Sequence, residues 1–317
     1  MELNQRERYM GALLGLAAGD ALGTTLEFTR PSPQPPLTDM VGGGPFGLEA
    51  GQWTDDTSMA LCLAESLVTV GGFDPADQMH RYLRWRDEGH LSSTGRCFDI
   101  GGTVSGALHR FAETGDPFAG ETHPHAGGNG SLMRLAPVAL AYGHDTAKAV
   151  KRAGEMSRTT HGAPEPVDAC RYYSVLLVGA LDGLAKAELL DEGYRFFQDD
   201  PAAPALAPAI ADIAAGSFRR RQPPEIRGTG YVVQSLEAAL WAFWHAEDFE
   251  SGALAAVNLG EDADTTGAIY GQLAGACFGV EDIPARWRAS LAMADRIVEF
   301  AEQLFELRQR LAARDGT

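Results

Sequence analysis

The sequence lacks the long apolar runs and the basic excess that mark membrane and nucleic-acid-binding proteins. No uninterrupted apolar run in the 317 residues reaches the ~18 residues of a membrane span, so we expect no membrane span. Asp and Glu total 43 against 26 Lys and Arg, which gives a net charge of −17. Binding of DNA or RNA normally requires a basic face, so we expect no nucleic-acid partner.

Paired cysteines and a secretory signal are also missing. Cys62, Cys97, Cys170 and Cys277 form no CxxC pair, and free thiols in a reducing compartment are the expected outcome. The first eight residues, MELNQRER, are charged and do not form a secretory signal. We therefore expect a cytoplasmic protein. A monomer is the expected oligomeric state. No Ser/His/Asp or Cys/His hydrolase signature is recognisable.

Apolar residues recur at three-to-four spacing along almost the whole chain, and no alternating pattern predicts a strand. The periodicity predicts helices over residues 9–23, 56–70, 168–187, 231–247 and 286–311. An apolar content of 45% is ordinary for a globular protein with a sizeable core. The sequence therefore predicts an all-α protein, a single compact multi-helix domain over residues 1–317.

Two stretches, residues 9–23 and the apolar stretch that follows the DADTT run at 262–266, which also reads as a helix, carry glycine at every fourth position. A glycine inside a helix costs about 1 kcal/mol relative to alanine, so such rows need a compensating gain. A row of glycines allows another backbone to approach closely, and we expect both helices at the centre of the bundle. The two rows are Gly11, Gly15, Gly19 and Gly23, and Gly267, Gly271, Gly275 and Gly279.

Aspartate and threonine cluster at residues 54–57 (TDDT) and 262–266 (DADTT), each at the start of an expected helix. Either cluster alone is consistent with ordinary helix capping. Capping needs only one such residue, however, and crowded carboxylates repel each other unless a cation neutralises them. Hard oxygen ligands favour Mg²⁺ or Mn²⁺. The two clusters together predict a site for a pair of divalent cations, assembled from both ends of the chain.

Five further positions have two readings each. Glu27 and Asp99 are acids between apolar residues, either half-exposed loop residues or carboxylates held in a cleft. The glycine-rich run 127–134 predicts either an anion-binding loop or a plain tight turn. His161 is by default a satisfied or capping histidine and alternatively a substrate contact. Tyr231 either begins the apolar face of its helix or presents its ring to a flat ligand.

In combination, five segments resemble the ADP-ribosylglycohydrolases, and within them the bacterial dinitrogenase-reductase-activating glycohydrolases. The segments are GALLGLAAGDALG (11–23), WTDDT (53–57), GNGSLMR (128–134), GYVV (230–233) and GEDADTTGAI (260–269). The resemblance implies an all-α fold with a binuclear Mg²⁺ or Mn²⁺ centre in a cleft. It also implies hydrolysis of the bond between ADP-ribose and a protein side chain, most often arginine. The implied partner is an ADP-ribosylated protein or an ADP-ribosyl small molecule.

The resemblance also implies roles for individual residues. The implied metal ligands are Thr54, Asp55, Asp56, Asp262, Asp264 and Thr265. Glu27 would lie on a mobile loop beside the metals and Asp99 in the cleft, and one of them would handle the proton. The diphosphate would be held by Gly128, Asn129, Gly130 and Ser131, with His161 beside the substrate and Tyr231 near the adenosine.

Other functions remain open on the sequence. They are hydrolysis of an O-linked (serine) ADP-ribose, metal-dependent hydrolysis of a phosphoester or diphosphate, and binding of ADP-ribose without catalysis. The resemblance does not extend to residues 29–51 or 195–228. The first of these segments is rich in proline and glycine and leads into the 54–57 cluster, so we expect it to be a loop that covers the site.

Overall fold

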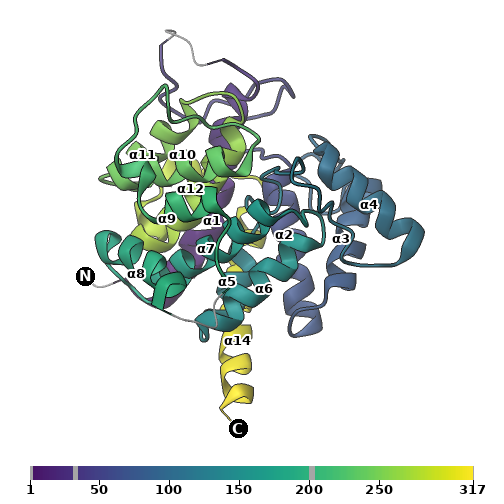
Figure 1. Ribbon diagram of the computed structural model, residues 1–317. Helices are drawn as coiled ribbons and strands as arrows, with labels where there is room; N and C mark the ends of the chain where they lie inside the picture. The colour runs from purple at the N-terminus through teal and green to yellow at the C-terminus, as the bar shows by residue number, and fades with distance from the viewer. Residues whose placement is uncertain (1–2, 31–34, 200–203, 317) are drawn as a thin grey trace.

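The chain folds into helices joined by loops in the computed structural model, which describes residues 3–30, 35–199 and 204–316 (Figure 1). In this part of the chain three isolated β-bridges occur and no strand, as the periodicity predicted. The helices are α1 (Gln5–Gly23), α2 (Asp55–Val70), α3 (Pro75–Glu88), α4 (Gly102–Thr114), α5 (Ala136–Tyr142), α6 (Thr146–Arg158), α7 (Pro164–Leu181), α8 (Lys186–Asp199), α9 (Pro208–Ala214), α10 (Val232–His245), α11 (Phe249–Val257), α12 (Ala263–Phe278), α13 (Ala285–Ser290) and α14 (Ala294–Asp315), with 3-10 turns η1 (Thr24–Leu26), η2 (Ser217–Arg219) and η3 (Val280–Asp282).

Helices α1 and α12 form the most extensive helix–helix contact in the described structure. Their glycine rows face each other: a Cβ on Gly15 would clash with the carbonyl oxygen of Gly271, and a Cβ on Gly271 with that of Gly15. Gly11 pairs in the same way with Gly275, and Gly19 with Gly267. The predicted close backbone approach is therefore confirmed. The last glycine of the second row differs, because Gly279 ends α12 with a φ of +83°.

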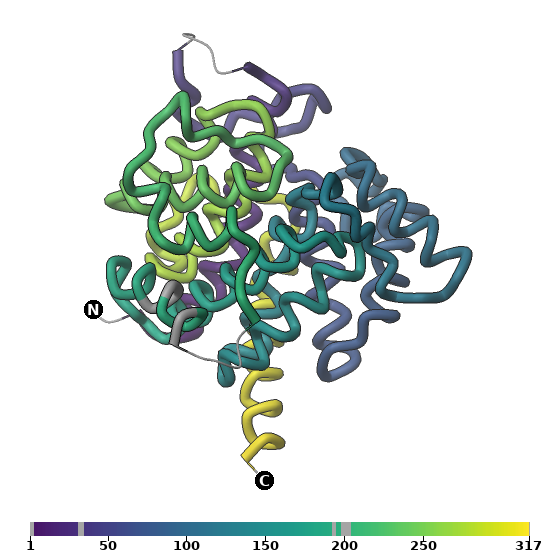
Figure 2. The backbone as a smooth tube through the Cα atoms, viewed as in Figure 1, coloured from purple at the N-terminus to yellow at the C-terminus, as the bar shows by residue number. Residues whose placement is uncertain are grey.

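The other helices surround this central pair. Helices α7, α10 and α11 pack against α12, while α14 contacts α1, α2 and α5. The tube in Figure 2 shows the N-terminal helix running through the middle of the molecule, with the last turns of α14 projecting from it. A second apolar cluster is centred on Met79, Tyr82, Trp85, Leu108 and Phe111. None of the described helices is long and apolar enough to cross a lipid bilayer.

The prediction of one continuous helix over 286–311 is wrong in one respect: the chain forms two helices there, α13 and α14, with a break between them. The Ala292 N–H donates to the Gly51 carbonyl at 2.9 Å, and Trp53 Nε1 donates to the Ala292 carbonyl at 3.1 Å. Met293 then has a φ of +52°. These backbone groups bind the loop before α2 instead of continuing a helix. The break thus anchors the segment that leads to the first acidic cluster.

The helix predicted over 168–187 is also displaced. It begins four residues earlier, as α7 at Pro164, and ends at Leu181. Gly183, with a φ of +85°, turns the chain before α8. Proline at the first helical position explains the early start, because its missing N–H needs no partner there.

The two segments that the resemblance left open lie on the surface for the most part. Within 29–51, residues 31–34 lie outside the described residues, and the rest forms loops whose Met40 and Leu48 are buried. Within 195–228, residues 200–203 also lie outside the described residues. Helix α9 and the 3-10 turn η2 form part of the rest of this segment. The four cysteines are free thiols, as expected.

Candidate active site

The two acidic clusters meet at the N-termini of α2 and α12. Thr54, which precedes α2, lies with its Oγ1 3.1 Å from Asp56 Oδ2 and 3.2 Å from Asp264 Oδ2 in the first turn of α12. All three side chains are buried. The prediction that distant acidic residues converge is therefore confirmed.

A third carboxylate, Asp20 of α1, joins them and was not among the predicted ligands. Asp20 is fully buried, and its Oδ1 accepts hydrogen bonds from the N–H and the hydroxyl of Thr54, both at 2.9 Å. It lies one residue after Gly19, so the close packing of α1 on α12 brings it to the start of α12. A carboxylate within an otherwise apolar, glycine-rich helix was the signal for it in the sequence.

These buried carboxylates have too few proton donors. Thr54 Oγ1 is within 3.2 Å of oxygens from Asp20, Asp56 and Asp264 but has only one proton to donate. Asp56 Oδ1 is buried without a hydrogen-bond partner. Among the residues that the structure describes, none of these carboxylates is in an ion pair with lysine or arginine. Burial, and then repulsion from neighbouring carboxylates, raises the pKa values of Asp56 and Asp264 well above normal.

The cluster fits cations by its geometry. Oxygens of Asp20, Asp56 and Asp264 lie within 4.8 Å of one another, and so do oxygens of Glu27, Asp262 and Asp264. Asp264 belongs to both groups, so two sites would share one carboxylate. All-oxygen donor sets of this kind suit Mg²⁺ or Mn²⁺. Of the remaining predicted ligands, Asp55 and Thr265 line the adjoining cavity.

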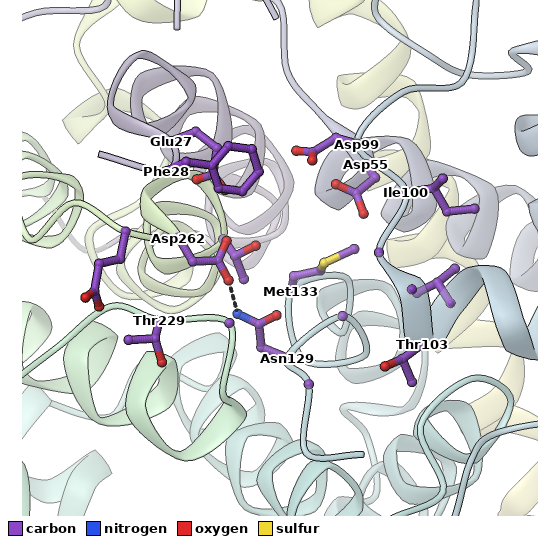
Figure 3. Close-up of a pocket in the computed structure, with 18 of the residues that line it drawn as sticks. Glu27, Phe28, Asp55, Asp99, Ile100, Thr103, Asn129, Met133, Thr229 and Asp262 are labelled. Atoms are coloured by element: carbon purple, nitrogen blue, oxygen red, sulfur yellow. Dashed lines mark hydrogen bonds between the residues drawn. The ribbon is translucent and has the colours of Figure 1, made fainter. Parts of the chain in front are cut away.

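That cavity has a volume of about 700 Å³ and opens beside the carboxylate cluster. Glu27 and Asp99 both line it, as Figure 3 shows. Glu27 Oε2 accepts the Ala263 N–H at 2.9 Å, which fixes it at the start of α12. Burial raises the pKa of Glu27 to about 8, with a contribution from the nearby Asp262. Burial and the charge of Asp262 also raise the pKa of Asp99 to about 7.

The glycine-rich loop forms the opposite wall of the cavity. Gly128, Asn129 and Gly130 line it, and Asn129 Nδ2 donates to Asp262 Oδ2 at 2.7 Å (the dashed line in Figure 3). The loop is thereby tied to the second acidic cluster. Ser131 is not at the cavity surface: it is fully buried, and its hydroxyl pairs with Ser157 Oγ at 2.8 Å.

His161 lies at the back of this loop. It lines the cavity, is 2% exposed, and its Nδ1 lies 2.9 Å from Thr160 Oγ1. Burial, with the charge of Arg134 as a second cause, lowers its pKa to about 3. The imidazole is therefore neutral at physiological pH, so it contacts a ligand as a neutral donor or acceptor.

Arg134 holds the loop and the His161 segment together. Arg134 is fully buried. Its guanidinium donates to the Gly130 carbonyl and also to Thr160 Oγ1, the latter at 2.7 Å. It also lies over the Tyr82 ring, 4.9 Å from the centroid. Sequence reasoning assigned this arginine no role, although a cation in the apolar run 131–140 was a visible signal.

Tyr231 lies beside the main cavity and not within it. It lines a neighbouring pocket of about 430 Å³ that shares Gly128 and Gly230 with the cavity. The residue is 40% exposed, and its hydroxyl donates to Glu165 Oε2 at 2.8 Å. The start of α10 therefore extends the glycine-loop wall outward.

The fold and the site together define a class: an all-helical protein with a polyacidic, cation-fitting cleft at the N-termini of α2 and α12. The family model for the ADP-ribosylglycohydrolases matches residues 1–314. The chain belongs to the ADP-ribosylglycohydrolase family and is an enzyme.

Several known proteins are similar over nearly the whole chain. An ADP-ribosylarginine hydrolase Tri1 of Pseudomonas putida (strain GB-1) is 44% identical over 300 residues, 95% of this chain and 78% of the relative. An ADP-ribosyl-[dinitrogen reductase] glycohydrolase of Rhodospirillum rubrum is 33% identical, over 90% of this chain and 91% of the relative. A solved ADP-ribosylglycohydrolase-related protein complex superposes with a TM-score of 0.84 at 44% identity, covering 96% of this chain and 99% of that one.

Proposed function

We propose that this enzyme removes ADP-ribose from arginine side chains of modified proteins, using two Mg²⁺ or Mn²⁺ ions. The relative from Pseudomonas putida, 44% identical, is named for ADP-ribosylarginine hydrolysis, which supports arginine as the modified residue. The observation that carries the proposal is the pair of carboxylate groups sharing Asp264 at the edge of a cavity of about 700 Å³. The volume is within the range of sites that enclose a nucleotide-sized ligand.

The acidic residues would hold the cations and the sugar. Asp20, Asp56, Asp262, Asp264, Glu27 and the Thr54 hydroxyl are the candidate ligands, with Asp55 and Thr265 next to them. Bound cations would fix the ribose hydroxyls and lower the pKa of a water. The neighbouring carboxylates would also favour cationic charge developing on the sugar at the transition state.

The other cavity residues would orient the nucleotide and move the proton. The backbone of Gly128, Asn129 and Gly130 would bind the diphosphate, with neutral His161 beside it and Tyr231 outward, near the adenosine. In the reaction, a water oxygen bonds to the anomeric carbon as the carbon–nitrogen bond breaks. Glu27 or Asp99 would accept the proton of the water, and the leaving nitrogen takes up a proton.

The test is release of ADP-ribose from ADP-ribosyl-arginine in Mn²⁺, by wild type and by Asp264→Asn. We expect the variant to lose at least ~100-fold in activity, because one carboxylate serves both cation groups. Asp295→Asn, at an exposed position on α14, is the matched control and should retain wild-type activity. An unchanged melting temperature in Asp264→Asn would exclude unfolding as the cause.

The product distinguishes the alternative functions. Release of AMP instead of ADP-ribose would indicate a diphosphate hydrolase. Faster turnover of ADP-ribosyl-serine than of ADP-ribosyl-arginine would indicate the O-linked reaction. Tight binding of ADP-ribose without any turnover in Mn²⁺ would indicate a binding module. Each of these results would contradict the proposal.

A further inference from the structure

An exposed aromatic ring lies at the mouth of the cavity. Phe28 follows Glu27, lines the cavity, and is 67% exposed. Its backbone is in the left-handed region with a φ of +59°, a conformation that a bulky residue adopts only when its surroundings impose it. An exposed apolar side chain on strained backbone contributes little to the core. Such residues are typical of functional sites.

The surroundings of Phe28 impose this conformation. The Phe28 N–H donates to the Glu261 carbonyl at 2.7 Å, and the Glu261 N–H donates to the Thr29 carbonyl at 2.6 Å. Glu261 also has a positive φ, +60°, and directly precedes Asp262. The backbone that presents the ring is therefore fixed to the backbone that presents an acidic side chain of the site.

Of three neighbouring aromatic rings contributed by separate loops, Phe28 is the one that lines the cavity. Its ring centroid lies 6.2 Å from that of Phe46, and Phe46 lies 5.3 Å from Phe98. Phe98 directly precedes Asp99, which lines the same cavity. The three rings make one aromatic rim, in which Phe46 and Phe98 are half-buried.

The aromatic rim and the glycine loop lie at opposite sides of the cavity. Figure 3 places Phe28 and Asp99 on one side and Asn129 on the other, with the Asp99 carboxylate directed toward the Phe28 ring. A nucleotide diphosphate on the Asn129 side and a ribose at the carboxylates would leave the Phe28 side for the group attached to the sugar.

We infer that the Phe28 ring, with Asp99 opposite it, binds the guanidinium of the arginine to which ADP-ribose is attached. This inference rests on the proposed function and names the residue that favours arginine over an uncharged linkage. A planar cation stacks on an aromatic face and pairs with a carboxylate at the same time, which is the recognition a guanidinium prefers. Phe28 is thus a specificity-determining residue.

The test compares Phe28→Leu with Phe28→Trp. Leucine keeps apolar bulk without a π face, and tryptophan strengthens the π face. We expect Phe28→Leu to lower kcat/KM for ADP-ribosyl-arginine by roughly 3- to 30-fold, the range of a partly desolvated cation–π contact. Phe28→Trp should stay within about 3-fold of wild type. The affinity for free ADP-ribose, measured by calorimetry, should be unchanged in both variants, because free ADP-ribose has no guanidinium.

Phe118→Leu is the matched control, since Phe118 is also an exposed phenylalanine, 41% exposed, and does not line the cavity. If Phe28→Leu behaved like Phe118→Leu, the ring would not bind the leaving group. A parallel loss of ADP-ribose affinity would mean that Phe28 supports the nucleotide site instead, which also contradicts the inference. If wild type left ADP-ribosyl-arginine intact, the proposed function would fail first, and this inference with it.

Discussion

Asp20 Oδ2 accepts both the N–H of Thr57, at 3.0 Å, and its hydroxyl, at 2.6 Å. Its other oxygen accepts the N–H and the hydroxyl of Thr54. One carboxylate of α1 thus caps the N-terminus of α2, where the helix itself supplies no side-chain cap. The same carboxylate belongs to one of the two cation-fitting groups, so helix capping and the metal site depend on a single side chain.

Asp20→Asn should therefore reduce both stability and Mn²⁺ affinity. An asparagine presents only one acceptor oxygen, so one pair of Thr donors loses its partner, at a cost of about 1–3 kcal/mol. Denaturant unfolding and Mn²⁺ titration by calorimetry would measure the two effects. Asp295→Asn is the control. A variant with wild-type Mn²⁺ affinity would show that Asp20 only caps α2.

Gly271→Ala should destabilise the protein by more than about 3 kcal/mol, because its Cβ would overlap the Gly15 carbonyl and force the central helices apart. The control is Gly106→Ala in α4, where a Cβ meets only the Arg110 guanidinium at an uncrowded 3.4 Å. That change should stabilise by about 0.5–1 kcal/mol through helix propensity. Similar unfolding midpoints for the two variants would argue against close backbone packing as the role of the glycine rows.

Removal of divalent cations should lower the melting temperature. Cations that bind only the folded state stabilise it by about 2.7 kcal/mol at a concentration of 100 times Kd, and the carboxylates around Asp264 repel one another without them. Thermal unfolding in EDTA and in excess Mn²⁺ would measure the difference. Asp264→Asn should respond much less than wild type. Identical curves in EDTA and Mn²⁺ would contradict the cation site.

His161 should make the protein less stable in acid. Its pKa is about 3 in the folded state against 6.5 normally, so between these values the unfolded chain binds a proton that the folded protein does not. Stability then falls as the pH falls below 6.5, by up to about 1.4 kcal/mol per pH unit.

The measurement is urea unfolding at pH 5 and pH 7 for wild type, His161→Asn and the exposed control His109→Asn. His161→Asn should lose part of the acid-induced destabilisation, while His109→Asn should keep the wild-type dependence. Equal pH dependence in wild type and His161→Asn would show that this imidazole is accessible to protons when the protein is folded.

The sequence predicted the fold class and the convergence of the acidic clusters because both depend on local patterns. Helical periodicity is visible within each helix, and the four-residue glycine spacing in α1 and α12 predicted that both lie at the centre of the bundle. The Asp and Thr residues at the starts of α2 and α12 outnumber what helix capping needs, and their crowded carboxylates indicated one shared cation site. Asp56 and Asp264 were found in this way.

The remaining parts of the site depend on packing between segments that carry no joint signal. Asp20 is a single acidic residue in the apolar part of α1, and only the packing of α1 against the start of α2 brings it to the acidic cluster. The break at Met293 arises because a loop near Gly51 uses the backbone of Ala292. Ser131 faces Ser157 and not the cavity, since the loop turns inward after Gly130. Each of these features is decided by a partner far away in the chain.

The pairing of α1 with α12 has a consequence for biosynthesis. Helix α1 ends at Gly23 and its partner α12 begins at Ala263, so α1 is made well before α12. At ~5–20 residues per second, the ribosome needs roughly 10–50 s to deliver that partner. Throughout this interval the nascent N-terminal helix exposes its glycine row and its leucines. A polypeptide that stops before α12 lacks one of the two central helices and the acidic cluster at residues 262–266, so the acidic centre assembles only after α12 has been made.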